Sequence, residues 1–125
     1  MQPPIPPPIR RFVLTSIASV PHLEALLLLR AAAPEHWPAA KVAKRLYIGE
    51  AAARALLDEL CEAGMLAAQA GLFAYQPATA ALGDTIDQLA ELYARNLVAI
   101  THLIHSRIDR QAQQFADAFR WRKDS

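Results

Sequence analysis

Hydrophobic residues recur every three or four positions over most of the chain, which predicts a largely helical protein. The clearest helix follows Ser19, which can cap it, and Pro21, which suits its first turn; the segment LEALLLLR comes next. Four leucines at 26–29 make this helix apolar on every side, so we expect it to be buried at the centre of the fold. Pro34 ends the helix and Pro38 begins the next one.

Two shorter helices and a β-hairpin are predicted in the middle of the chain. AAKVAKRL predicts an amphipathic helix with Val42 and Leu46 inward, and YIG predicts a three-residue turn. EAAARALLDELCEAG, from Glu50 to Gly64, predicts a second helix with an inward face formed by Ala53, Leu56, Leu57 and Leu60. MLAAQ and LFAYQ flank Ala70-Gly71, which predicts a tight hairpin because Gly71 supplies the positive φ that such a turn needs.

One long helical pattern occupies the C-terminal third, from about Asp84 to Arg120. Its apolar positions 82, 93, 104 and 115 repeat every eleven residues, about 3.67 residues per turn, which is close to a straight helix. Such a helix would be roughly 55 Å long, too long for the small body before it to cover. We therefore expect the excess to pack on a second copy, or the helix to break near Ser106-Arg107. The predicted homodimer contact is made by Leu89, Tyr93, Leu97, Ile100 and Ile104.

The N-terminal segment MQPPIPPPI contains five of the nine prolines. Proline fixes φ and lacks a backbone donor, so residues 1–11 are predicted to form an extended arm with polyproline character. The apolar segment Phe12–Ile17 follows. We expect a short helix there that packs on the core or on a twin chain.

The predicted order of elements is helix, helix, three-residue turn, helix, hairpin and long helix, which is the order of a winged helix-turn-helix domain. The segment from Val20 to Pro77, about half of the chain, resembles MarR-like bacterial regulators. The likeness is carried by EAGML and by Val42, Ala43, Leu46, Ile48, Leu57 and Leu60. We predict a mainly α fold with an extended Pro-rich arm over residues 1–11, a winged helix-turn-helix domain with a short hairpin wing over 12–78, and a long C-terminal helical dimerisation segment over 79–125.

The resemblance implies that the helix beginning at Glu50 enters the major groove of DNA with its N-terminal side chains against the base edges. By that match, the base-facing positions are Glu50, Ala51, Ala52, Arg54, Ala55 and Asp58. Only Arg54 is of a type that reads a base through two hydrogen bonds. The helix before it would cross the phosphate backbone and contact it through Lys41, Lys44 and Arg45. The alternative interpretation is that these three basic side chains only form a solvated helix face.

The distribution of charge complicates DNA binding. The formal net charge is +1, but residues 1–48 carry +4, residues 49–91 carry −6 and residues 92–125 carry +3. The helix assigned to the major groove lies in the acidic segment. The hairpin AAQAGLFAYQ has no charged side chain, whereas the wings of the family often carry basic side chains. Asp58 is the carboxylate most in the way of a duplex. It lies four residues after Arg54, so the two can pair, while Glu59 lies further around the helix and can turn aside.

We predict a non-enzymatic, cytoplasmic bacterial DNA-binding transcriptional regulator that acts as a homodimer. The alternative is a winged-helix protein-interaction module that has lost DNA readout, in which the alanine-rich face of the same helix binds a protein partner. Phosphate-binding loop, dinucleotide, zinc-peptidase and nucleophile-elbow motifs are absent from the sequence, so we expect no catalytic site and no cofactor. The longest apolar run, from Ala25 to Leu29, is far shorter than the ~20 residues of a membrane span, so we expect no membrane partner.

Three other features have a structural as well as a functional interpretation. His102, His105 and Asp109 share a helix face at metal-ligand spacing, but no further Cys or His obviously completes a tetrahedral set, so we expect a polar face and no metal. Cys61 has acidic neighbours, which disfavour a reactive thiolate. His36-Trp37-Pro38 is predicted to be a loop in which Trp37 packs on the next helix, with a ligand pocket as the alternative.

Overall fold

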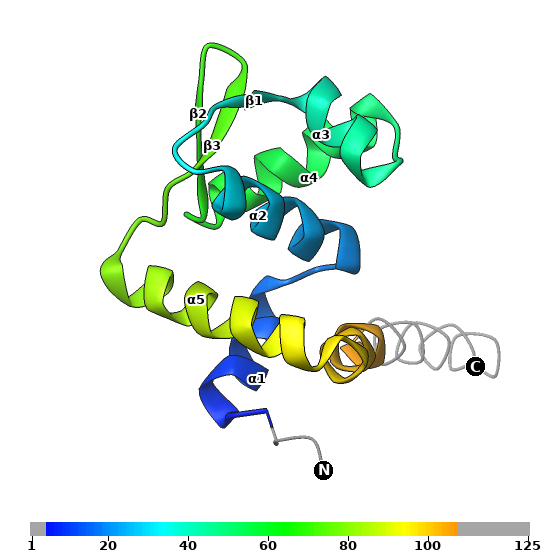
Figure 1. The fold of residues 1–125 in the computed structure, drawn as a ribbon, viewed down its shortest axis with the longest axis vertical. Helices are drawn as coiled ribbons and strands as arrows, with labels where there is room; N and C mark the ends of the chain where they lie inside the picture. The colour runs from blue at the N-terminus through cyan, green and yellow to red at the C-terminus, as the bar shows by residue number, and fades with distance from the viewer. Residues whose placement is uncertain (1–4, 108–125) are drawn as a thin grey trace, which may run out of the picture.

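The computed structural model describes residues 5–107, which are mainly helical and carry one small antiparallel sheet (Figure 1). The elements, in chain order, are α1 (Pro7–Ser16), α2 (Val20–Ala32), β1 (Trp37–Pro38), α3 (Ala39–Leu46), α4 (Glu50–Glu62), β2 (Leu66–Gln69), β3 (Leu72–Tyr75) and α5 (Ala80–Arg95). Residues 97–107 are helical as well. The mainly α fold with a short hairpin, expected from the sequence, is confirmed.

Helix α2 lies across the middle of the molecule, between the α3–α4 unit and α5 (Figure 1). Its side chains Leu23, Ala25, Leu26 and Leu29 are buried, as the apolar pattern predicts. Ser19 caps the helix, because its hydroxyl accepts a hydrogen bond from the backbone N–H of His22 at 3.3 Å. The buried side chains on both sides of α2 belong to one hydrophobic cluster.

The sheet has the strand order β1-β3-β2, and all its pairs are antiparallel. The hairpin of β2 and β3 pairs Leu66 with Tyr75, as expected from the two runs around Ala70-Gly71. Strand β1 corrects the loop predicted at His36-Trp37-Pro38, because Trp37 pairs with Phe73 of β3. A strand of two residues is too short to show alternation, and its proline is tolerated because β1 is an edge strand.

Helix α1 begins at Pro7, so the prediction of an extended arm over residues 1–11 is wrong for residues 7–11. The first turn of a helix needs no backbone donor, and prolines therefore fit there. The helix buries Ile9 and Val13, and Ile17 follows it into the same core. The apolar segment Phe12–Ile17 thus packs on its own chain, which was one of the two expected outcomes.

Among residues 5–107, no single helix is long and apolar enough to cross a membrane. Helices α1 and α2 together have the length and apolar composition of a span, but they are bent by 110° relative to each other. Both helices bury apolar side chains in the core of the protein.

The C-terminal helical pattern is interrupted at Asn96, before the predicted position near Ser106-Arg107, and the described residues are then helical through Arg107. The backbone N–H of Asn96 ends α5 with a 2.7 Å hydrogen bond to the Leu92 carbonyl, and its side-chain oxygen accepts from the Ala99 N–H at 3.3 Å. Asparagine readily satisfies exposed helix ends in this way, so one residue serves as the C-cap of one helix and the N-cap of the next. Hydrophobic periodicity does not detect such a break, because the apolar spacing continues through it.

The interruption changes the interpretation of the apolar stripe. Leu89, Ile100 and Ile104 are 0% exposed and Tyr93 is 8% exposed within a single chain, whereas Leu97 is 52% exposed. The argument that one chain cannot bury this stripe is therefore wrong, since the chain turns at Asn96 and covers four of the five side chains itself. A homodimer stays a prediction, now without that argument. The stretch 108–120 of the predicted helix lies outside the described residues.

The hairpin contains an unfavourable residue that can be corrected. Ala70 has φ 54° and Gly71 has φ 78°, so both central residues of the turn are left-handed. Ala70→Asn should raise the free energy of unfolding by about 0.5–1 kcal/mol, because asparagine tolerates this conformation better than alanine. Denaturant unfolding measures the change. Ala68→Asn, in the adjacent strand, is the matched control and should not stabilise; a loss of stability in Ala70→Asn would contradict the turn geometry.

A short hydrogen bond joins α2 to α5, because the Tyr93 hydroxyl donates to Glu24 Oε1 at 2.5 Å. Burial, and after it the hydrogen bond to Glu24 and the charge of Glu24, raise the pKa of Tyr93 to about 12. Tyr93→Phe should lower the free energy of unfolding by about 1–2 kcal/mol at pH 7, because Glu24 loses its donor.

The same substitution should change the pH dependence. The folded-state pKa is raised above the unfolded value of about 10, so its stabilising contribution is complete below pH ~10 and is lost as the pH rises toward 12. Denaturant unfolding can be measured between pH 8 and 12, at about one measurement per pH unit. The free energy of unfolding should fall less over this range for Tyr93→Phe than for wild type. Tyr47→Phe is the control, because the Tyr47 side chain is 95% exposed and its environment changes little on unfolding. Equal alkaline losses in wild type and Tyr93→Phe would contradict the assignment.

Candidate nucleic-acid interface

Helices α3 and α4 form a helix-turn-helix, and the buried side of each fixes which side faces outward. Helix α3 buries Ala39, Val42 and Ala43, and α4 buries Ala53, Leu56, Leu57 and Leu60. The backbone N–H groups of Tyr47 and Ile48 both donate to the Ala43 carbonyl, which closes the end of α3 tightly. The outward faces of α3 and α4 and the turn between them are therefore the parts of this unit that a partner can contact.

The three basic side chains predicted to contact DNA phosphates, Lys41, Lys44 and Arg45, are all exposed on α3. Two of them lie against one aromatic ring: Lys41 Nζ is 3.9 Å from the centroid of the Trp37 ring, and Arg45 Cζ is 5.6 Å from it. The Trp37 indole N–H donates to Glu35 at 2.7 Å, which fixes the ring. These cation–π contacts hold two cations on the surface beside Lys44, which restricts their motion without neutralising them.

The sequence does contain a signal for this arrangement, although our reading of the sequence missed it. Trp37, Lys41 and Arg45 are spaced four residues apart, so Lys41 and Arg45 share one face of α3, and Trp37 lies two residues before the start of that helix. We expected only that Trp37 would pack on this helix, and its 5% exposure agrees with that expectation.

The outward side of α4 carries a mixture of small and acidic side chains. All six positions matched to base contacts are exposed, namely Glu50, Ala51, Ala52, Arg54, Ala55 and Asp58. Within the described part of the chain, Arg54 forms no ion pair with Asp58, although their spacing allows one. The guanidinium of Arg54 is therefore available to a partner, and the carboxylate of Asp58 is exposed one turn further along the same helix.

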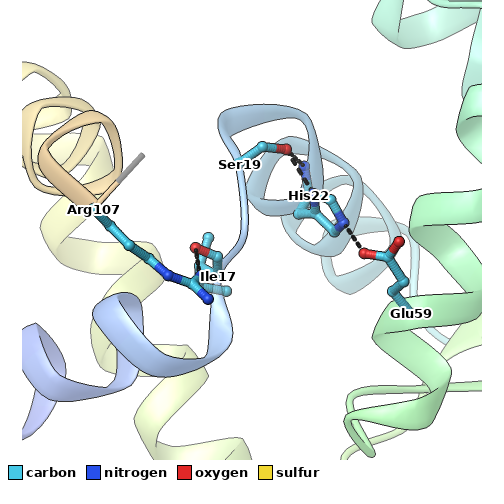
Figure 2. Close-up of polar contacts among 5 residues, drawn as sticks. All are labelled: Ile17, Ser19, His22, Glu59 and Arg107. Atoms are coloured by element: carbon cyan, nitrogen blue, oxygen red, sulfur yellow. Dashed lines mark hydrogen bonds and ion pairs between the residues drawn. The ribbon is translucent and has the colours of Figure 1, made fainter. Parts of the chain in front are cut away.

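Glu59 is turned toward α2 by a histidine that lies 37 residues earlier in the sequence. His22 Nε2 lies 2.7 Å from Glu59 Oε2, and His22 Nδ1 lies 2.6 Å from the Ser19 hydroxyl (Figure 2). With the proton on Nε2, the imidazole donates to Glu59 and accepts from Ser19, which also accepts the backbone N–H of His22. The expectation that Glu59 turns aside is confirmed, but its partner could not be identified from local spacing.

The segment between α1 and α2 is also held from its other side. Arg107 Nη1 donates to the Ile17 carbonyl at 3.2 Å (Figure 2). Arg107 therefore fastens this short segment to the C-terminal helical residues, while His22, in the first turn of the adjoining α2, contacts α4. Both link parts of the sequence that are far apart, and no local pattern predicts them.

The wing offers a partner no charge. Its tip, residues 68–71, is exposed and consists of alanine, glutamine and glycine. Basic wing residues, which the MarR-like resemblance would lead one to expect, are therefore missing from this surface. Any electrostatic attraction of the helix-turn-helix for an anionic partner comes from α3 and from Arg54.

Tyr47 is the residue of this surface that the sequence reading left aside. It ends α3 in the left-handed conformation, with φ 56° and ψ 44°, and its side chain is 95% exposed. A non-glycine residue in this conformation costs roughly 1–2 kcal/mol. The tyrosine ring offsets none of that cost through packing, because almost all of it lies in solvent.

Cys61 and the two C-terminal histidines do not add a chemical site to this surface. Burial and, secondarily, the carboxylate of Asp58 raise the pKa of the Cys61 thiol, which disfavours the reactive thiolate. His102 and His105 are exposed, and the described residues bring no three Cys, His, Asp or Glu side chains together as metal ligands. Asp109, the third predicted member of that set, lies outside the described residues.

Comparison of the sequence with models of known protein families and with curated proteins finds no match. The helix-turn-helix surface itself is therefore the guide to function. Its main properties are four exposed cations, an uncharged wing, exposed carboxylates on α4, and one exposed aromatic ring.

Proposed function

We propose that this chain is a non-enzymatic, cytoplasmic DNA-binding transcriptional regulator of the winged-helix type that acts as a homodimer. The observation that carries the proposal is the exposure of Lys41, Lys44, Arg45 and Arg54 on one helix-turn-helix, while Glu59 is held toward α2 by His22. Duplex DNA is a dense linear anion, and cations placed on a helix-turn-helix are the groups that position such a domain on the phosphate backbone.

The chemistry of the surface favours contact with phosphates over direct reading of bases. Helix α4 offers one bidentate donor, Arg54, and its exposed alanines can make only apolar contacts with thymine methyl groups. Asp58 and Glu62 repel phosphates and lower the affinity for any sequence. The proposed binding is consequently weak in sequence preference and strongly dependent on salt.

A second function is supported by a different observation. The wing tip is uncharged, and α4 presents Ala51 and Ala55 beside the carboxylate of Asp58, which suits a flat contact with another protein. In this alternative, the domain is an interaction module without DNA readout. Ala51→Arg or Ala55→Arg would then abolish binding of the protein partner, because a long side chain would separate the two surfaces.

Removing the three cations of α3 tests the phosphate contacts. Lys41→Ala, Lys44→Ala and Arg45→Ala combined should weaken binding to all duplexes alike and reduce the slope of log affinity against log salt by about 3, one per lost contact. Fluorescence anisotropy with a random duplex at several salt concentrations measures both quantities.

The control for this experiment has the same change in charge. Arg10, Arg11 and Arg95 are exposed on α1 and α5, and their combined replacement by alanine should leave the slope unchanged. Arg54→Ala should behave differently and relax the preference at one base position by ~1–3 kcal/mol. Equal losses in the two triple variants would mean that only net charge matters and that α3 is not the contact.

Asp58→Ala separates DNA binding from the alternative function. If α4 approaches a duplex, removal of this carboxylate should tighten binding to random DNA at low salt by roughly fivefold, since a like charge a few ångströms from a phosphate costs about 1 kcal/mol in water. Glu91→Ala on α5 makes the same change in charge at an exposed site away from the helix-turn-helix and is the control. No gain for Asp58→Ala beyond that of the control would show that α4 does not approach DNA.

A further inference from the structure

We propose that Tyr47 is a DNA-contact residue whose phenol hydroxyl donates a hydrogen bond to a phosphate of the bound duplex. The inference rests on the proposed function, and it adds a neutral aromatic contact to the cations described above. Tyr47 lies in the turn between the two helices of the helix-turn-helix, which joins the basic helix to the helix expected in the major groove.

The backbone at Tyr47 is fixed in a conformation that tyrosine does not favour. Its φ of 56° lies in the left-handed region, where glycine and asparagine are the residues that fit best. The N–H groups of Tyr47 and Ile48 converge on the Ala43 carbonyl, so the turn itself requires this conformation whatever the side chain. A side chain that is unfavourable in a fixed conformation points to a role outside the fold.

The exposure of the ring supports the same conclusion. Of the six aromatic residues within 5–107, Trp37, Phe73 and Tyr93 are buried and Phe12 and Tyr75 are half-buried, whereas Tyr47 is 95% exposed. The other large exposed hydrophobic side chains, Leu97 and Val98, lie just after α5 and not on the helix-turn-helix. Among residues 5–107, Tyr47 is therefore the one aromatic residue whose ring is not at least half-buried, and it lies in the turn between the two helices of the proposed interface.

The neighbours of Tyr47 select a phosphate as its partner. Lys44 and Arg45 occupy the last turn of α3, directly before Tyr47, and Arg54 lies on the second turn of α4. A duplex held by these cations brings its backbone to the turn between them. A tyrosine hydroxyl is a common donor to DNA phosphates, and its short, rigid side chain loses little conformational entropy on binding.

Two substitutions of the full chain separate the hydroxyl from the backbone strain. Tyr47→Phe keeps the ring and the left-handed strain but removes the donor. Tyr47→Asn removes the ring and suits the left-handed conformation, so its Tm should rise by a few degrees. Both variants should bind a random duplex about five- to tenfold more weakly than wild type at low salt, as expected for the net contribution of one solvent-accessible hydrogen bond.

The salt dependence distinguishes this contact from a lysine contact. A neutral donor displaces no counterion, so the slope of log affinity against log salt should stay at the wild-type value in both Tyr47 variants. A more stable variant that binds DNA less tightly would also show that the loss is not caused by unfolding. Anisotropy titrations of the three proteins, together with their thermal unfolding curves, give all of these quantities.

Each contrary result has a distinct meaning. If wild type binds the duplex and both variants bind equally well, Tyr47 is not a contact, and the proposed function stands without it. If only Tyr47→Asn is weakened, the ring makes the contact, and the hydrogen bond from the hydroxyl is wrong. If wild type does not bind random duplex at low salt, the proposed function and this inference both fail, and the exposed ring belongs to a protein-docking surface.

Discussion

The position of every other element depends on the burial of α2. This helix is apolar on almost all sides, so it is stable only when two layers of structure cover it. Each fully buried leucine contributes about 1.5–3 kcal/mol, and three leucines of α2 are completely buried. The helix-turn-helix and the sheet cover one side, and α5 covers the other (Figure 1). Contacts from Glu24 to Tyr93 and from Arg30 to Asp87 then fix α5 on α2 by directional polar interactions.

The sequence predicted the elements whose signals are local and failed where the outcome depended on distant parts of the chain. The central helix, the helix-turn-helix and the hairpin follow from apolar spacing and from turn residues, and the structure confirms them. Strand β1 exists only because Phe73 pairs with Trp37. Helix α1 starts within a proline-rich segment, and composition alone does not distinguish a first helical turn from an extended arm. The apolar stripe of the C-terminal third was recognised, but periodicity does not say which surface covers it.

The candidate interface shows the same division. Helical geometry placed the three cations of α3 on an outward face, and the MarR-like resemblance placed Arg54 and the other base-facing positions on α4; all of them are exposed. The state of each side chain could not be predicted in the same way, because it depends on partners from other elements: Trp37 holds two of the cations, and His22 holds Glu59. The strain at Tyr47 could not be predicted, because tyrosine is unusual in the left-handed conformation and no glycine or asparagine marks that position. Local patterns thus predicted the positions of charge, and tertiary contacts determined how much of that charge is free.

The break at Asn96 has a consequence for how the protein unfolds. A continuous helix would extend away from the rest of the fold after Arg95. The break instead brings Ile100 and Ile104 into the same hydrophobic cluster as Ile9, Ile17 and the leucines of α2. The first and last described helices therefore share one hydrophobic core with the helix-turn-helix. Unfolding of α1 or of residues 97–107 would expose side chains that share this core with α2, so we expect both segments to unfold together with the helix-turn-helix and α4 to lose its orientation in the same step.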